Sequence, residues 1–431
     1  MSLFLGAMKH HIPGRKQYTE ESALLRLMPS KEVYIPLVAG NNTDLEVFVQ
    51  EGEHVNVGTK LACTKTGFHV PIYSSVSGTY KGIVKRMHNS LRPQNHMVIE
   101  CDHQQTVQKA FEPLDYHTAS REECEEFVKN AGIVGLGGAG FPTYVKYLKP
   151  DGLDYVIVNA VECEPYITAD YRMIRDDASH LVTGCEIMKK LADANKVLIC
   201  IKKSHPDLIH DVQEALQGVK DIEVRPVPDV YPMGWERVLV REVLHKEYDI
   251  LPAEAGAVVG NASTAIAIAK AFENGEAIHE KYVTISGEAI KHPTNVVVPV
   301  GMPVSEIIEA CGGYTCDNVR LIAGGPMMGK TIVNDQFVID RSMNAITILP
   351  DQPDQSIACL RCGRCSDHCP SGLQPVRIAA ALKANDVDEM MKRGAQSCIE
   401  CGLCTYICPS KIDVTENVRK AKRIVAMKKK K

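Results

Sequence analysis

Hydrophobic residues in the middle of the chain alternate between continuous runs and helical spacing. Two continuous apolar runs, at residues 154–160 and 196–202, predict strands buried on both faces, and residues 222–227 are expected to form a third strand. Between the first two, helical spacing is shown by Leu181, Cys185, Met188 and Leu191. Strands that alternate with amphipathic helices predict an α/β domain with a mostly parallel sheet.

The pattern before and after this region is different. Residues 33–100 show short strand-like runs separated by glycine turns, and two of them, at 47–57 and 71–79, resemble the half-motifs of a lipoyl- or biotinyl-type hybrid barrel. The tip between the halves, Lys65 to His69, lacks the methionine-flanked lysine of a biotin carrier, so we expect a structural barrel without a prosthetic group. Residues 283–329 alternate strands with one helix at 305–311 and indicate a small β-grasp-like module of the SLBB type.

The expected fold class is therefore α/β multidomain. The expected domains are a hybrid-barrel β region, an α/β domain, a β-grasp-like module and an α-helical C-terminal domain, at 1–121, 122–279, 280–345 and 346–431.

Composition narrows the function classes. The chain has 431 residues, 45% of them hydrophobic, and a formal net charge of −4, which argues against nucleic acid as the main partner. Neither a secretory leader nor an uninterrupted apolar stretch of about 18 residues is present, so no transmembrane span is expected. The expected compartment is the reducing cytoplasm.

Half of the 16 cysteines form two runs near the C-terminus, each C-x2-C-x2-C-x3-C-P. This is the bacterial ferredoxin pattern for two [4Fe–4S] clusters, in which the fourth cysteine of each run ligates the other cluster. The predicted ligand sets are Cys359, Cys362, Cys365 and Cys408 for the first cluster, and Cys398, Cys401, Cys404 and Cys369 for the second. The alternative is a pair of zinc ribbons, which would use separated cysteine pairs.

A glycine-rich loop, GLGGAGFPT, spans residues 135–143. It matches G-x-G-x-x-G, but the polar, helix-like segment before it does not suit a dinucleotide fingerprint, which follows a strand. Bare backbone N–H groups can approach an anion here, and Pro142 suits the first turn of a helix that points toward a phosphate. The alternative is a purely structural tight turn.

The loop resembles the G-x-G-G-x-G-F-P-T loop of the flavin- and NADH-binding subunit of respiratory complex I. The segments NAVECEPY (159–166), YPMGWE (231–236) and NAST (261–264) resemble that family's later elements. Together with AGGPMMG, both cysteine runs and the barrel, the order of segments is similar to the RnfC family, the C subunits of the Rnf complex, a membrane-bound ferredoxin:NAD oxidoreductase that pumps Na⁺ or H⁺.

The resemblance implies a flavin-binding α/β domain at 122–279, an SLBB module at 280–345 and an α-helical diferredoxin domain at 346–431. It implies FMN, two [4Fe–4S] clusters and NAD(H) as substrate, in an NADH:acceptor oxidoreductase. It implies cofactor contacts from Gly135, Gly137, Gly138, Ala139, Gly140, Phe141, Thr143, Lys146, Asn159, Glu162, Glu164, Tyr231, Gly234, Glu236, Asn261 and Thr264. Lys146 is expected as a counter-charge to the FMN phosphate, or else as a solvated helix residue. No catalytic residue is named, because hydride transfer to a flavin requires no protein acid or base.

The expected partners are the other subunits of an Rnf-type complex, with this chain peripheral on the cytoplasmic face of the membrane. Two alternatives stay open: a soluble relative that donates electrons to a proline or cobalamin reductase, and an iron–sulfur scaffold without flavin. The basic tail, residues 419–431, is expected to be a disordered solvated end, or else a weak contact to anionic lipids.

Overall fold

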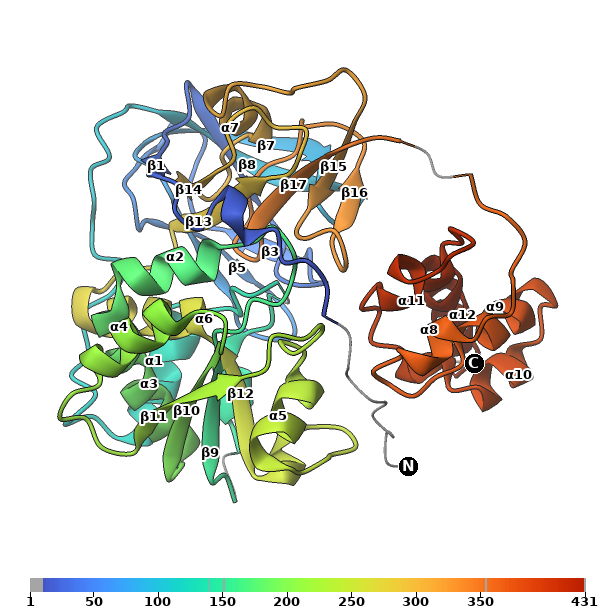
Figure 1. Cartoon of the computed structure of the whole chain (residues 1–431). Coiled ribbons are helices and arrows are strands. Elements are labelled where there is room, and N and C mark those ends of the chain that lie inside the picture. The colour runs from blue at the N-terminus through green and yellow to red at the C-terminus, as the bar shows by residue number, and fades with distance from the viewer. Residues whose placement is uncertain (1–10, 139, 150–151, 353–354, 430–431) are drawn as a thin grey trace.

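The computed structural model describes residues 11–138, 140–149, 152–352 and 355–429. Three units lie together, and a fourth helical unit is joined to them by an extended stretch after β17 (Figure 1). These units give the expected fold class: a β barrel region, an α/β domain, a β-rich module with one helix and an α-helical end. The domain boundaries themselves stay a prediction.

The barrel region contains two antiparallel sheets, in the orders β2-β8-β7-β4 and β3-β5-β6. Its strands are β2 Glu32–Pro36, β3 Leu45–Val47, β4 His54–Val55, β5 Lys60–Thr64, β6 Pro71–Tyr73, β7 Gly78–Met87 and β8 Pro93–Cys101. Alternate apolar side chains such as Val33, Ile35, Met97 and Ile99 form the core between the two sheets.

The α/β domain is built on a parallel sheet in the order β11-β10-β9-β12. Its strands are β9 Tyr155–Asn159, β10 Lys196–Lys202, β11 Ile222–Val227 and β12 Ala257–Asn261. Its helices are α1 Arg121–Asn130, α2 Ala169–Asp176, α3 Ala178–Ala192, α4 Pro206–Ala215, α5 Glu236–Leu244 and α6 Ala262–Asn274, with short 3-10 helices η2 Thr143–Tyr147 and η3 Pro252–Ala255.

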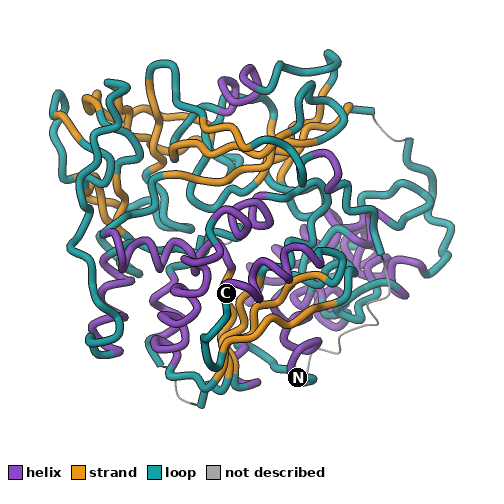
Figure 2. Tube along the Cα trace, turned by 60° about the vertical axis from the view of Figure 1, so that its left-hand side comes forward, coloured by secondary structure: helices purple, strands orange, loops and turns teal. Residues whose placement is uncertain are grey.

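Helices cover both faces of this sheet (Figure 2). On one face, α3 and α6 pack against Val156, Val158 and Val197. On the other, α5 packs against Ile157 and Leu198. The strands β9 and β10 are thus buried on both sides, which explains their continuous apolar runs. Burial on both sides does not extend to β11, an edge strand that exposes Arg225 and Pro226. Gly184 allows the close approach of α3 and α6, because a Cβ there would lie 2.0 Å from the carbonyl oxygen of Ala265.

The β-rich module contains a six-stranded sheet in the order β1-β14-β13-β17-β15-β16. Its elements are β13 Glu280–Ser286, β14 Thr294–Pro299, α7 Val304–Ala310, β15 Val319–Ala323, β16 Lys330–Ile332 and β17 Ala345–Pro350. The edge strand β1, Leu24–Arg26, comes from the N-terminal part of the chain, just after η1 Lys16–Tyr18, and pairs parallel with β14.

The C-terminal unit is helical, with α8 Arg364–Asp367, α9 Pro375–Lys383, α10 Val387–Lys392, η4 Ala395–Ser397, α11 Leu403–Tyr406 and α12 Val414–Lys429. The expectation of a disordered tail is wrong as far as residue 429, because α12 buries Val418, Ala421 and Val425 against α9 and α10. Residues 430–431 lie outside the described residues.

Candidate functional site

The strand order places a ligand site between β9 and β12. The chain runs outward from β9 through β10 to β11 and then returns to the other side of β9 with β12, so this is a topological switch point. Ligands of open α/β sheets bind at such points, beyond the carboxyl ends of the strands. Asn159 and Asn261 end these two strands and are register partners.

Both asparagines hold neighbouring segments in place. Asn159 donates from Nδ2 to the carbonyl of Gly234 (2.8 Å) and accepts from the N–H of Val161 (3.1 Å). Asn261 donates to the carboxylate of Asp170 (2.7 Å), and its side chain caps α6 by accepting from Thr264 N. The two amides therefore join three of the predicted segments at one edge of the sheet.

The glycine loop lies against this edge. Leu136 is fixed on both sides: its N–H donates to Thr264 Oγ1 (3.0 Å), and its carbonyl accepts from the buried Lys281 (3.3 Å). A Cβ on Gly137 would lie 3.0 Å from the side chain of Asn261, and Gly138 has a φ of +116°, which side-chain-bearing residues rarely adopt. Close approach and backbone conformation thus both require glycine here.

The helix expected after Pro142 differs from the prediction. It is the five-residue 3-10 helix η2, with Pro142 as its N-cap. Thr143 is buried and donates its N–H to Ile133 O (2.9 Å), while Phe141 is half-exposed. Ala139 lies outside the described residues. Any anion at this loop would depend on the loop's own N–H groups more than on a helix dipole.

Lys146 follows the loop and is partly buried. Its Nζ donates to the carbonyl of Val259 on β12 (2.7 Å), and burial lowers the pKa of this ammonium. The side chain is therefore not the solvated helix residue of the alternative interpretation. Its role as a phosphate counter-charge stays a prediction.

The acidic segment supplies two partly buried carboxyl groups. Glu162 accepts from the N–H groups of Asp170 (2.9 Å) and Tyr171 (3.4 Å) at the start of α2. Glu164 accepts from the N–H groups of Met327 (3.1 Å) and Met328 (2.7 Å). Burial raises the pKa of both groups, that of Glu164 to about 7, although the two N–H donors of the methionines oppose the rise.

These segments surround a cavity of about 470 Å³. The predicted residues that line it are Gly137, Gly138, Asn159, Glu162, Glu164, Gly234 and Asn261. Of the remaining predicted residues, Thr264 supports the loop from behind, Glu236 accepts from the hydroxyl of Tyr248 (3.0 Å), and Tyr231 reaches the cysteine-rich unit.

The lining also includes residues that the sequence reasoning missed. They are Cys163, Asp170, Trp235, Gly324, Gly325, Met328, Lys330, Ser342, Met343 and Asn344. Most of them belong to the β-rich module, and the motif AGGPMMG was the one sequence signal that could have indicated them. Trp235 lies inside the motif YPMGWE, between two residues that were predicted.

The lining fits a flavin. The indole Nε1 of Trp235 is buried and has no hydrogen-bond partner among the described residues. This N–H is not exposed to the cavity, so Trp235 contributes other atoms to the lining. The cavity offers in addition the bare backbone at Gly137 and Gly138, and the carboxyl groups of Glu162 and Glu164. Polar groups of both kinds around an apolar wall suit a heteroaromatic ring with a polar tail.

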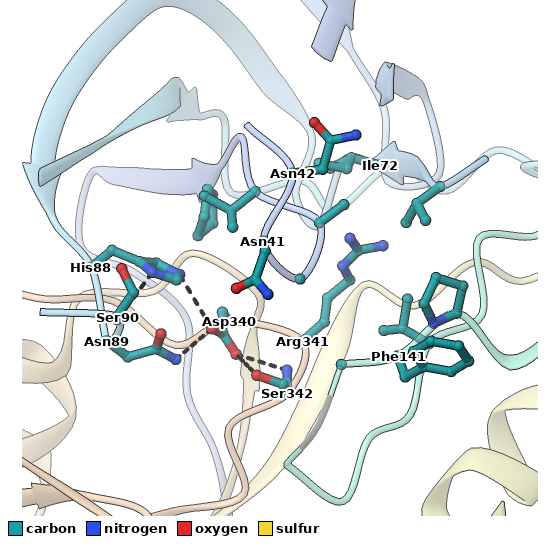
Figure 3. Close-up of a pocket in the computed structure, with 18 of the residues that line it drawn as sticks. Asn41, Asn42, Ile72, His88, Asn89, Ser90, Phe141, Asp340, Arg341 and Ser342 are labelled. Carbon is teal, nitrogen blue, oxygen red and sulfur yellow. Dashed lines mark hydrogen bonds and ion pairs between the residues drawn. The ribbon is translucent and has the colours of Figure 1, made fainter. Parts of the chain in front are cut away.

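A second cavity of about 790 Å³ adjoins the first and shares Asn89, Gly138, Lys330 and Ser342 with it. Its walls come from the barrel, the glycine loop and the β-rich module (Figure 3). In its wall Asp340 binds His88, Asn89 and Ser342. Burial disfavours the charge of this carboxyl, but the hydrogen bonds of His88 and Ser342 hold its pKa at about 2.

Arg341 extends into this second cavity (Figure 3). Its guanidinium donates to the carbonyls of Pro71 (3.2 Å) and Gly132 (3.4 Å). Both acceptors are neutral, so these two bonds do not pair the positive charge with a carboxylate. Two half-exposed rings line the same cavity as Arg341. They are Phe68 of the barrel and Phe141 of the loop, which meet edge to face with their centroids 5.6 Å apart. A cation beside exposed rings suits an anionic, aromatic ligand.

The cysteine runs occupy two different environments. Cys369, Cys398, Cys401 and Cys404 line one small cavity, as the crossed ligand set requires. In the other set, Cys359 and Cys362 are exposed, and Cys365 and Cys408 are partly buried. The structure thus brings the fourth cysteine of the first run to the second run, while the ligand assignment itself stays a prediction.

The loop of Cys401 lies against the α/β domain. Tyr231 donates its hydroxyl hydrogen to the carbonyl of Cys401 (2.7 Å), and Ile12, Leu403 and Met327 complete an apolar contact around them. A Cβ on Gly402 would lie 2.4 Å from the carbonyl oxygen of Met327, so the two backbones touch. Met327 in turn donates to Glu164 in the first cavity. One residue therefore links the cavity wall to a cysteine loop.

Comparison with known families gives four matches along the chain. They are the RnfC barrel sandwich hybrid domain at residues 9–104, the Nuo51 FMN-binding domain at 128–270, the SLBB domain at 282–331 and a 4Fe-4S dicluster domain at 358–413.

Similar curated proteins span nearly the whole length. The C subunit of the Na(+)-translocating ferredoxin:NAD(+) oxidoreductase complex of Acetobacterium woodii is 34% identical over 97% of both chains. The proton-translocating counterpart of Clostridium ljungdahlii is 34% identical over 86% of this chain and 82% of its own. Among solved structures, an NAD+-reducing [NiFe]-hydrogenase in the H2-reduced state is similar in fold, with a TM-score of 0.52, 17% identity, and coverage of 71% of this chain and 63% of that one.

Proposed function

This chain belongs to the RnfC family, the C subunits of ion-translocating ferredoxin:NAD+ oxidoreductase complexes, and we propose how its residues hold the cofactors of that activity. It is an NADH-linked electron-transfer subunit with FMN, [4Fe–4S] clusters and NAD(H) as its redox partners. FMN supplies the conversion of a two-electron hydride into single electrons, which neither a nicotinamide nor an iron–sulfur cluster can perform.

The first cavity is the proposed flavin site. Gly137 and Gly138 would present backbone to the phosphate end, while Asn159, Glu162, Glu164 and Trp235 would surround the ring. The observation that carries this assignment is the backbone of Gly137 and Gly138 beside Asn159 and Asn261 in a cavity at the switch point of the sheet. The second cavity, with Arg341 and its exposed rings, would receive the nucleotide part of NAD(H).

The arrangement of the cysteines orders the two clusters. The site formed by Cys369, Cys398, Cys401 and Cys404 would be the inner one, because the loop of Cys401 contacts Tyr231 and Met327 at the cavity wall. The site formed by Cys359, Cys362, Cys365 and Cys408 would be the outer one, with two exposed cysteines that face a partner protein. We call these two the inner and the outer cluster site.

Gly138→Val tests the flavin site. A Cβ at this position would meet no atom within 4 Å, but the valine side chain would fill the proposed phosphate cradle and strain a φ of +116°. We expect the variant to lose FMN binding, as measured by fluorescence titration, while its iron content stays at the wild-type level. Wild-type affinity for FMN in the variant would contradict this placement.

We further propose that the chain acts in the translocase class, docked on integral subunits at the cytoplasmic face of the membrane. No helix in the described part of the chain combines the length and hydropathy needed to cross a bilayer. Fractionation of native cells tests the docking: the chain should sediment with membranes and co-purify with membrane subunits in mild detergent. Recovery of all the protein in the high-speed supernatant would favour the alternative, a soluble donor to a dedicated reductase.

A further inference from the structure

An N-terminal segment, residues 12–19, lies along the acidic loop of the flavin site. Figure 1 shows this part of the chain, in dark blue, passing from the β-rich module toward the N-terminus beside the α/β domain. Tyr166 donates its N–H to the carbonyl of Gly14 (2.8 Å), and its ring stacks on that of Tyr18 at 5.9 Å. Thr19 and Thr168 share a buried hydroxyl hydrogen bond of 2.7 Å. The segment and the loop therefore form one packed unit.

Lys16 is the centre of this unit. It is only 8% exposed, and its ammonium donates to the carbonyls of Glu162 (2.8 Å), Glu164 (2.9 Å) and Ile167. An ammonium has three N–H donors, so all of them are used on one loop. Lys16 precedes Glu162 by 146 residues in the chain, so local sequence does not explain the contact.

The loop needs such a partner. Its backbone has positive φ at two non-glycine residues, Glu162 (43°) and Tyr166 (68°), a conformation that costs free energy and persists only when other contacts hold it. Inward carbonyls of a buried loop must also be satisfied, and Lys16 satisfies three of them.

The charges around Lys16 come from several elements. Glu162 and Glu164 belong to the loop, Lys202 ends β10, and Cys163 lies between the two acids. Burial lowers the pKa of Lys16, and the two carboxyl groups favour its charged form. The carboxyl groups themselves are bound elsewhere, by the N–H groups of Asp170, Tyr171, Met327 and Met328. Lys16 thus fixes the backbone of the loop, and these donors fix its side chains.

We propose that Lys16 is a positioning residue of the flavin site: it holds the loop from Glu162 to Ile167 in the conformation that turns both carboxyl groups to the cavity. This inference rests on the proposed function of that cavity. It also assigns a role to the N-terminal segment, whose Ile12 packs on Tyr231 and Cys401 at the inner cluster site.

The test compares Lys16→Met, Lys16→Arg and the matched control Lys31→Met in the full-length protein with its clusters. Lys31 lies in the same N-terminal region but is 70% exposed. The readouts are the FMN dissociation constant from flavin fluorescence, the rise in melting temperature caused by FMN, and the iron content. Wild type is titrated first, so that failure of the proposed function, seen as no FMN binding by wild type, is distinguished from failure of this inference.

Lys16→Met should weaken FMN binding by about tenfold or more, since charge-assisted hydrogen bonds to the loop are lost, and should reduce the FMN-induced rise in melting temperature. Lys16→Arg should lie between it and wild type, and Lys31→Met should match wild type. A lysine with only a structural role would lower the melting temperature equally with and without FMN, and that result would overturn the proposal. If Lys16→Met fails to fold, wild-type FMN affinity in Lys16→Arg would overturn it as well.

Discussion

Trp235 is the residue that reports most directly on the flavin site, because it is the single tryptophan of the chain and lines the first cavity. Addition of FMN to flavin-free protein should quench its emission with a saturable titration, since a flavin within contact accepts its excitation energy. Trp235→Phe should remove this signal, because the sequence contains no other tryptophan.

Gly138→Val serves as the control for this titration, because it should bind no FMN and show no saturable quenching. Saturable FMN binding that leaves the emission of Trp235 unchanged would place the flavin elsewhere.

Glu164 makes FMN binding depend on pH. Burial raises its pKa to about 7, so it is protonated below that pH and becomes negatively charged as the pH rises through it. Because FMN is itself an anion, we expect its affinity to fall between pH 6 and pH 8 in wild type. Glu164→Gln removes this charge and should make the profile shallower, with the remaining slope due to Glu162, whose pKa is also raised by burial. Glu112→Gln, at an 88% exposed side chain, should leave the slope unchanged. Equal slopes in wild type and Glu164→Gln would refute this explanation.

The sequence predicted these site residues unevenly. Asn159, Glu162, Glu164 and Asn261 could be predicted, because each of them lies in a segment that resembles a known motif. Lys281 was not, because it reaches Leu136 from the β-rich module, 145 residues away in the chain. Such contacts depend on how separate domains pack, and a single sequence carries no pattern for them.

At the scale of elements, the crossed cysteine runs give a clear prediction. Cys369→Ser should damage the inner cluster site, and Cys408→Ser the outer one, although each residue belongs to the run of the opposite site. Iron should fall from about eight to about four per chain in each variant, since each cluster holds about four iron atoms. Electron paramagnetic resonance of the reduced protein should show a different remaining signal in the two variants.

Matching signals from Cys369→Ser and Cys408→Ser, or a loss of the cluster formed by the variant's own run, would contradict the crossed arrangement.

Elements with a regular apolar pattern agree with the sequence-based predictions more closely than irregular ones do. The helix α3 and the strands β9, β10 and β11 were predicted from their apolar patterns, whereas the fourth strand of the parallel sheet, β12, was not. The segment after Pro142 became the 3-10 helix η2, since Thr143 bonds to Ile133 and ties the turn to the preceding segment. The tail is part of α12, because Val418, Ala421 and Val425 are spaced so that they form one buried face of this helix. The many lysines and arginines of the tail make this apolar spacing hard to recognise in the sequence.

For the whole molecule, the arrangement joins units that the sequence presents as a linear series. Strand β1 from the N-terminal part completes the sheet of the β-rich module, and Tyr231 and Met327 from two different units meet the loop of Cys401. With the proposed cofactors bound, this packing would join the first cavity and the two cluster sites into a path with an inner and an outer end. The segment order was available from the sequence, but the path was not.

The central claim is that electrons from NADH reach the clusters only through the flavin site. Its most direct test is anaerobic electron paramagnetic resonance after addition of NADH to protein with a full iron content, comparing FMN-loaded wild type with Gly138→Val. Dithionite should reduce the clusters in both proteins and so confirm that they are intact. NADH should produce the reduced-cluster signals in wild type and none in the variant; equal signals from NADH in the flavin-free variant would contradict the account.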